Sequence, residues 1–157
     1  MNATPPLPTE TALPDWNFHR NFRLLTWHPV GVLDDALLDR IVDFLEWEEK
    51  AAEFPFDRYT DFDGLTQIQL QIGHIFQIAE HHRSTYEEEP VKSAFFCDRF
   101  IGHGIARLYQ ELMVGAPVEV RVFWTREAAA EWLQVPISVL TPGGTGYEPR
   151  PGDRERQ

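Results

Sequence analysis

The second half of the chain alternates between strand-like and helix-like spacing of its apolar residues. Residues 91–98 read VKSAFFCD and residues 118–125 read VEVRVFWT, two apolar runs with the length of strands. Residues 100–113 and 126–133 follow them, and there the apolar positions recur every three or four residues, as on one face of a helix. Two successive strand and helix units predict an α/β domain with a mostly parallel sheet.

The first half predicts further elements of both kinds. We expect residues 22–33 to form a strand pair, or one bent strand, around Pro29 and Gly31. A helix is expected from Asp34, a suitable N-cap residue, to about Lys50, because the apolar residues between them have helical spacing. The remaining expected elements are strands over 56–61 and 65–70 and a helix over 72–86.

Two strands differ in how polar their faces are. The strand around Phe95 is apolar on both faces, which is typical of the centre of a sheet with helices on each side. The strand that contains Arg121 alternates apolar with polar residues, so we expect it at an edge or an interface. Thr125 is expected to cap the short helix that follows, and Pro136 is expected to end it.

Length and composition predict one domain between two flexible ends. A chain of 157 residues that is 43% hydrophobic can build one ordinary core. Residues 1–21 are expected to form a flexible N-terminal arm because proline and polar residues are frequent near its start. Residues 141–157 hold many glycines and prolines and are expected to form a flexible C-terminal tail. The folded domain is therefore predicted over residues 22–140.

Charge and cysteine content disfavour several kinds of partner and site. The net charge is −11, so nucleic acid and anionic membrane surfaces would on average be repelled. Cys97 is the single cysteine and lies in an apolar run, so a buried thiol is expected. We find no signal sequence and no apolar stretch long enough to span a membrane, and we therefore expect a cytoplasmic protein.

Four segments carry a resemblance to a known family: GVLDDALLDRIVDFL at 31–45, DRYTDFDGLTQIQL at 57–70, VKSAFFCD at 91–98 and VRVFWTREAAAEWL at 120–133. Together they resemble SpoIIAA-like proteins of the STAS/Sec14-type superfamily. The resemblance implies a single layered domain with a sheet of four or five mostly parallel strands packed by helices. Anti-sigma-factor antagonists of this superfamily carry a phosphorylatable serine, whereas here no serine or threonine lies between Thr66 and Ser84. A phosphate switch is therefore not expected.

Polar residues near predicted strand ends are the candidate binding residues, because ligands of open α/β sheets bind beyond the carboxyl ends of strands. They are Asp61, Asp63, Gln69, Gln71, Asp98, Arg99 and His103. Turn formation and helix capping are the alternative roles for the first four. Asp98 and His103 would serve as an acid and base pair in an enzyme, although the sequence positions no serine or cysteine nucleophile beside them.

Histidines on the predicted helix over 72–86 do not have the spacing of a metal site. His74 and His81 are seven residues apart, about 10.5 Å of helix rise, which is too far for ligands of one ion. His81, His82 and Arg83 are instead expected to interact with the C-terminal carbonyl groups of their own helix. We therefore expect neither a metal nor a cofactor.

Three functions remain open at this point. The first is a non-enzymatic, regulatory module that binds a protein partner or a small apolar or anionic ligand. The second is a carrier of a lipid or hydrophobic metabolite, which would need a deep apolar cavity. The third is an enzyme that uses Asp98 and His103. A homodimer is also expected, with Trp16, Arg121, Phe123 and Trp124 as its candidate surface.

Overall fold

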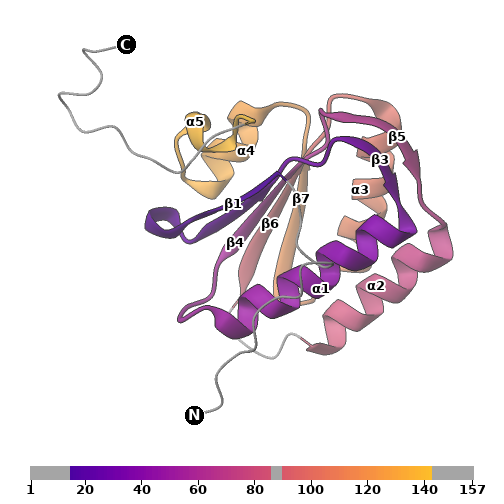
Figure 1. Cartoon of the computed structure of the whole chain (residues 1–157), viewed down its shortest axis with the longest axis horizontal. Helices are drawn as coiled ribbons and strands as arrows, with labels where there is room; N and C mark the ends of the chain where they lie inside the picture. The colour runs from indigo at the N-terminus through magenta and orange to yellow at the C-terminus, as the bar shows by residue number, and fades with distance from the viewer. Residues whose placement is uncertain (1–14, 86–89, 143–157) are drawn as a thin grey trace.

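The computed structural model describes residues 15–85 and 90–142 (Figure 1). Most of the predicted arm and tail, residues 1–14 and 143–157, lies outside this range. The elements along the chain are β1 Trp16–His19, the 3-10 helix η2 Arg20–Phe22, β2 Leu24–Trp27, β3 Gly31–Asp34, α1 Asp35–Ala51, β4 Asp57–Asp61, β5 Leu65–Gln69, α2 Ile72–Thr85, β6 Val91–Phe96, α3 Phe100–Leu112, β7 Val118–Phe123, α4 Arg126–Leu133 and α5 Ile137–Leu140.

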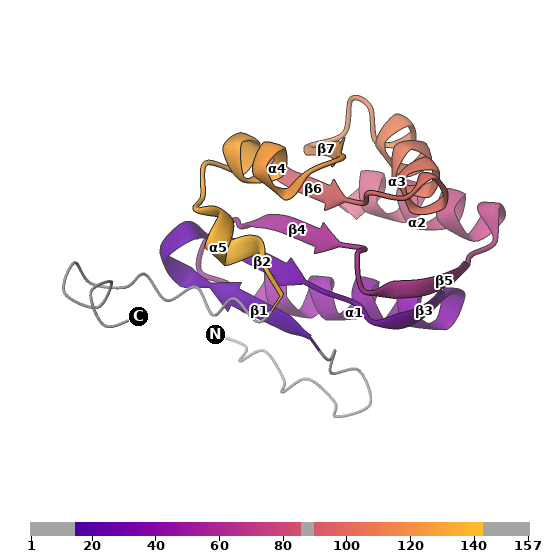
Figure 2. The ribbon, with the colours of Figure 1, turned by 90° about the horizontal axis from the view of Figure 1, so that it is seen from above.

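The main sheet has five strands in the order β1-β2-β4-β6-β7 (Figure 2). Strand β1 runs antiparallel to β2, and the other neighbouring pairs are parallel. This topology confirms the predicted α/β class with a mostly parallel sheet, and the predicted edge position of β7 is also correct. No helix in the described part of the chain is long and apolar enough to cross a membrane.

Three expectations about the strands and helices need correction. The middle strand is β4 and not β6, because β1 adds a further strand on the other side of the sheet. That strand begins at Trp16, inside the segment for which an arm was predicted, and it is too short for its alternation to be evident beside several prolines. A further short helix, α5, follows Pro136 and was not predicted.

Helices cover both faces of the main sheet (Figure 1). Helices α1, α2 and α3 pack on one face, and α4 and α5 pack on the other. Side chains of a strand alternate between faces, so Tyr59 of β4 and Ala94 of β6 lie under α4, whereas their neighbours Arg58 and Ser93 face the other helix layer. Arg58 and Ser93 are thereby placed beneath α1–α3.

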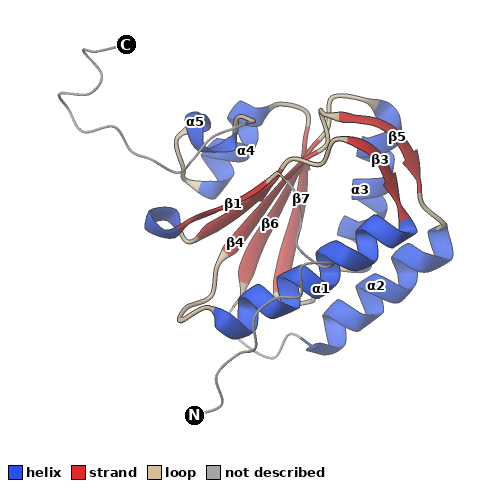
Figure 3. Ribbon diagram, viewed as in Figure 1, coloured by secondary structure: helices blue, strands red, loops and turns tan. Residues whose placement is uncertain are grey.

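The chain repeats one arrangement twice before β6. A strand of the main sheet is followed by a short strand and then a helix, first as β2, β3 and α1 and then as β4, β5 and α2. The two short strands pair in parallel and form a separate ladder beside the main sheet (Figure 3). Because β3 leads into α1 and β5 leads into α2, this ladder sets the starts of the two helices side by side.

Capping groups fix where the helices begin and end. The Asp34 side chain accepts a hydrogen bond from the Leu37 backbone N–H at 2.8 Å, and Thr125 accepts one from Ala128 at 3.2 Å, so both predicted N-caps are confirmed. Arg83 binds carbonyl groups as expected, but those of the neighbouring helix. Its guanidinium donates to the carbonyl oxygens of Leu112 and Val114 at the end of α3, which ties α2 to α3.

Candidate functional site

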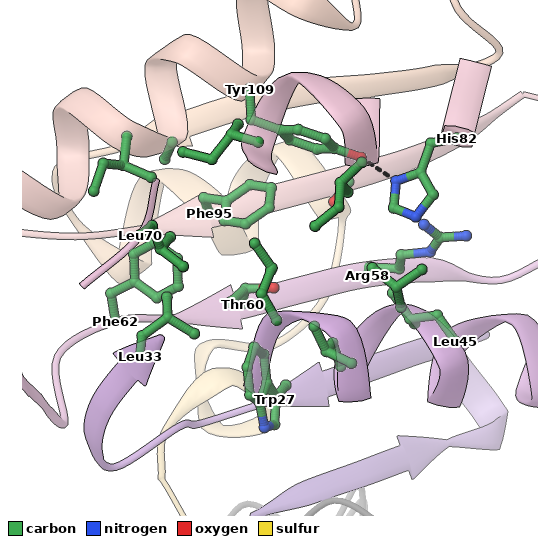
Figure 4. A pocket seen from close by; sticks show the side chains of 18 of the residues that line it. Trp27, Leu33, Leu45, Arg58, Thr60, Phe62, Leu70, His82, Phe95 and Tyr109 are labelled. Atoms are coloured by element: carbon green, nitrogen blue, oxygen red, sulfur yellow. Dashed lines mark hydrogen bonds between the residues drawn. The ribbon is translucent and has the colours of Figure 1, made fainter. Parts of the chain in front are cut away.

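A cavity of about 90 Å³ lies between the main sheet and the layer of α1, α2 and α3 (Figure 4). Its wall is mostly apolar, and Figure 4 shows Leu33, Phe62 and Leu70 at one end. The other end is polar, with Arg58, His82 and Tyr109 close together, and Thr60 lies between the two ends. An apolar cavity with a few grouped polar side chains is the usual form of a small-molecule site.

The charge at the polar end is balanced within the protein. The buried guanidinium of Arg58 in β4 forms an ion pair with the carboxylate of Glu49 in α1. His82 of α2 and Tyr109 of α3 are joined by a hydrogen bond of 2.7 Å between imidazole Nδ1 and the phenol oxygen. Burial lowers the pKa of His82 to about 3 and raises the pKa of Tyr109 to about 12, so both rings are neutral at pH 7.

Two hydroxyl groups in the cavity wall have no hydrogen-bond partner among the described residues. One belongs to Ser93, which is 4% exposed, and the other to Thr60. Ser93 is in register with Arg58 across the β4–β6 pair, and Thr60 lies two residues further along β4 on the same face. Since a strand rises about 3.3 Å per residue, the two hydroxyl-bearing positions are separated by about 7 Å along the sheet.

Polar side chains join α1 and α2 beside the cavity. The Asp35 carboxylate accepts a hydrogen bond from the backbone N–H of Gln71 at 3.1 Å. Further along, His74 Nε2 lies 2.7 Å from the Asp39 carboxylate, and His81 contacts Glu46. These histidines thus pair with acidic residues of α1, and no group of three or more His, Cys, Asp or Glu side chains in the described ranges could hold a metal ion.

Asp61 and Asp63, predicted from the sequence as binding residues, lie at the carboxyl end of β4. The Asp61 carboxylate is 1% exposed and accepts hydrogen bonds from Tyr59 Oη and from Arg126 Nε, both at 2.7 Å. Arg126 also donates to Asp63 at 3.2 Å. Burial, followed by the Asp61 charge, raises the pKa of Tyr59 well above its usual range. We refer to Tyr59, Asp61, Asp63 and Arg126 as the Asp61 cluster.

Arg126 was not among the predicted site residues, although the sequence contains a signal for it. It lies in the first turn of α4, where a positive charge opposes the helix dipole. An arginine at such a position needs an acidic partner from elsewhere in the fold, and the Asp61 cluster supplies one. The cluster satisfies its own polar groups, so its geometry is that of a structural ion pair.

The other predicted binding residues do not form one site. Gln69 and Gln71 are exposed on β5 and at the start of α2. Arg99 donates to the backbone carbonyl oxygens of Phe62, Asp63 and Leu65, and so holds the turn between β4 and β5. Among the described contacts, none joins Asp98 to His103.

His103 instead packs beneath an aromatic side chain. Its ring stacks on Trp124 with centroids 3.6 Å apart and an interplanar angle of 14°. Burial lowers the pKa of His103. Phe100, 87% exposed, contacts the edge of Trp124, which is 47% exposed, so these two aromatics form a small apolar patch next to α3.

The four residues predicted for a dimer surface have different surroundings. Trp16 packs on Phe44 of α1 with ring centroids 4.7 Å apart, and Phe123 packs on Trp132 at 5.6 Å. Arg121 is exposed on the edge strand and pairs with Glu119 at 3.1 Å. Trp124 is therefore the member of this set whose ring presents a large exposed apolar surface.

Gly102 in α3 lies against the buried thiol of Cys97, whose pKa is raised by that burial. A Cβ atom at position 102 would lie 2.5 Å from Cys97 Sγ and 3.4 Å from Ile68 Cδ1. We expect Gly102→Ala to lower the free energy of unfolding by up to about 2 kcal/mol, because a clash worth about 1–3 kcal/mol is only partly offset by the helix-propensity gain of about 1 kcal/mol. Urea unfolding followed by circular dichroism measures the change.

The control for this prediction is the same substitution in a variant that lacks the Cys97 sulfur atom. In a Cys97→Ala background, Gly102→Ala is expected to stabilise the protein by about 0.5–1 kcal/mol. Gly104→Ala should stabilise the parent protein by a similar amount, since no atom lies within 4 Å of its added Cβ. Equal destabilisation by Gly102→Ala in both backgrounds would show that the sulfur contact is not the cause.

The strand order and the two helix layers define this chain as a layered α/β domain with a mostly parallel sheet. Among solved structures it is similar to an uncharacterised protein of the DUF3478 family with a SpoIIAA-like fold, from Shewanella loihica PV-4. The two share 17% sequence identity, and the match covers 70% of this chain and 83% of the other with a TM-score of 0.46.

No protein-family model and no curated protein matches the chain.

Proposed function

We propose that this domain is a non-enzymatic binding module that holds a small, largely apolar molecule in the cavity between the sheet and helices α1–α3. The observation that carries the proposal is the cavity itself: about 90 Å³ of space in the middle of the fold, with a mostly apolar wall and polar groups at one end. Atoms that line an apolar cavity make fewer packing contacts than atoms in a filled core. A ligand that fills the cavity regains those contacts.

The volume favours a small ligand over a lipid. An apolar cavity of about 150 Å³ accepts one benzene molecule, so about 90 Å³ suits a guest of roughly four non-hydrogen atoms. A lipid carrier would need α1 and α2 to separate, which would break the contacts of Asp35, Asp39 and Glu46 with α2. The cavity therefore fits a compact ligand better than it fits a lipid.

The arrangement also favours binding over catalysis. Asp98 and His103 do not contact one another, and His103 is covered by Trp124. An acid and base pair must lie within hydrogen-bond reach of the groups between which it moves a proton. The remaining alternative, docking of a protein partner, is supported by the exposed Phe100 and Trp124 and does not exclude a guest in the cavity.

Xenon and isobutene are suitable probes of the cavity, since both are small and apolar. We expect each to shift the amide NMR signals of residues that line the cavity, such as Thr60 and Phe95, with little effect on α4 and α5. An Ala106→Leu variant is expected to abolish these shifts, because Ala106 lines the cavity and the larger side chain would occupy the space. Absence of any shift in the parent protein at saturating xenon would contradict the proposal.

A matched control adds the same bulk on the opposite face of the sheet. Ala130 lies in α4 and is buried against the face of the sheet opposite the cavity. Ala130→Leu is expected to destabilise the protein by about 1–3 kcal/mol, because that core is filled, and to keep the probe shifts. Ala106→Leu is expected to change stability by less than about 1 kcal/mol, since its added atoms enter empty space. Ala106→Val serves if the leucine variant does not fold.

A further inference from the structure

The cavity wall has unpaired hydrogen-bonding groups but no unbalanced charge. Ser93 and Thr60 carry hydroxyl groups that no other described residue binds. Ser93 is buried and Thr60 is half-buried, and a hydroxyl that faces an apolar cavity without a partner is unfavourable, because it has fewer hydrogen bonds than in bulk water. Both hydroxyls lie on the strand face that forms the floor of the cavity, so a guest molecule is the group placed to pair with them.

The described wall of the cavity offers no unpaired charge to a charged ligand. Arg58 is the cationic side chain of the wall formed by the described residues, and Glu49 already pairs with it. The two titratable rings beside it, of His82 and Tyr109, are both neutral at pH 7. A carboxylate or an ammonium ion would leave water without gaining a counter-ion, which is strongly unfavourable.

The polar groups also indicate how the guest is oriented. Ser93 is in register with Arg58 at the polar end, and Thr60 lies between that end and the apolar end formed by Leu33 and Leu70 (Figure 4). A guest whose single polar atom faces Ser93 or Thr60 places its carbon atoms toward the apolar end. This orientation pairs one of the two hydroxyls and fills the apolar space at once.

We propose that the cavity selects a small, neutral molecule with an apolar body and one hydrogen-bonding oxygen, such as a short alcohol or ketone, and that Ser93 or Thr60 binds this oxygen. The inference rests on the proposed function, since it names the chemical class of ligand for the same cavity. Hydroxyl groups both donate and accept hydrogen bonds, so they suit either an alcohol or a carbonyl group.

Four probes of similar size and planar shape test this selectivity: acetone, isobutene, acetate and guanidinium, each titrated at millimolar concentration and followed by amide NMR shifts. Acetone and isobutene are expected to bind, and the two ions are not. In a Ser93→Ala, Thr60→Val double variant, the affinity for acetone relative to isobutene is expected to fall about five- to tenfold. Thr66→Val, on the exposed surface of β5, is the control and should leave this ratio unchanged.

The outcomes separate the two proposals. If isobutene binds but the ratio of acetone to isobutene affinity is the same in the double variant, the ligand class is wrong while the cavity remains a binding site. Tighter binding of acetate than of acetone would likewise overturn the ligand class and would point to Arg58 as the recognition group. If neither isobutene nor xenon binds, both the proposed function and the ligand class are wrong.

Discussion

Replacing Asp61 by alanine is expected to lower the free energy of unfolding by about 3–5 kcal/mol, the usual cost of removing one partner from a buried ion pair. The carboxylate is 1% exposed and binds both Tyr59 Oη and Arg126 Nε at 2.7 Å. Its removal leaves a fully buried phenol without a partner and a partly buried guanidinium without its closest counter-ion. Urea unfolding at pH 7, followed by circular dichroism, measures the loss.

Asp63→Ala is the matched control, because both aspartates pair with the same arginine. The Asp63 side chain is 46% exposed and its contact with Arg126 is longer, at 3.2 Å. Exposed ion pairs contribute little, so this substitution is expected to cost less than about 1 kcal/mol. Equal free energies of unfolding for the two variants would show that burial does not make Asp61 more stabilising than Asp63.

Acidification is expected to destabilise the protein partly through His82. The pKa of this imidazole is lowered to about 3 by burial and then by the nearby Arg58 charge, against 6.5 for an ordinary histidine. Between these two values the unfolded chain binds a proton that the folded protein does not, so the free energy of unfolding falls as the pH falls. The loss from pH 7 to pH 5 at this one group is about 2 kcal/mol.

The contribution of His82 is measured as a difference between variants. Urea unfolding of the parent protein and of His82→Gln at pH 7 and at pH 5 should show a pH-dependent loss that is about 2 kcal/mol smaller in the variant. Burial also lowers the pKa of His19 and of His103, so the variant is expected to keep some pH dependence of the same sign. His81→Gln, at the neighbouring position of α2, controls for loss of a histidine from the same helix. Equal pH dependence in the parent and in His82→Gln would contradict this prediction.

Much of the fold could be predicted from the sequence because it depends on local patterns. The apolar spacing in α1 and the strand runs of β6 and β7 are long enough to distinguish helix from strand. The N-caps Asp34 and Thr125 act within one turn of their own helices. Strand β1 and helix α5 were missed because four residues are too few to show a period.

The site was harder to predict because it depends on contacts between distant segments. Ser93 and Arg58 lie on different strands, and only the pairing of β4 with β6 brings them together. Empty volume has no sequence pattern at all. Asp61 was correctly predicted to lie near a strand end, but its pairing with Arg126, 65 residues later in the chain, required the topology of the sheet.

One long-range hydrogen bond has a consequence for folding during translation. His28, at the end of β2, donates from Nε2 to the carbonyl oxygen of Leu140 in α5, 2.7 Å away and 112 residues later. A nascent chain that has not yet emerged as far as α4 and α5 leaves Tyr59 and Ala94 uncovered on one side of the sheet. Such late closure slows folding and leaves an apolar surface open during translation. Ribosome-bound intermediates of this chain should therefore be good clients for chaperones.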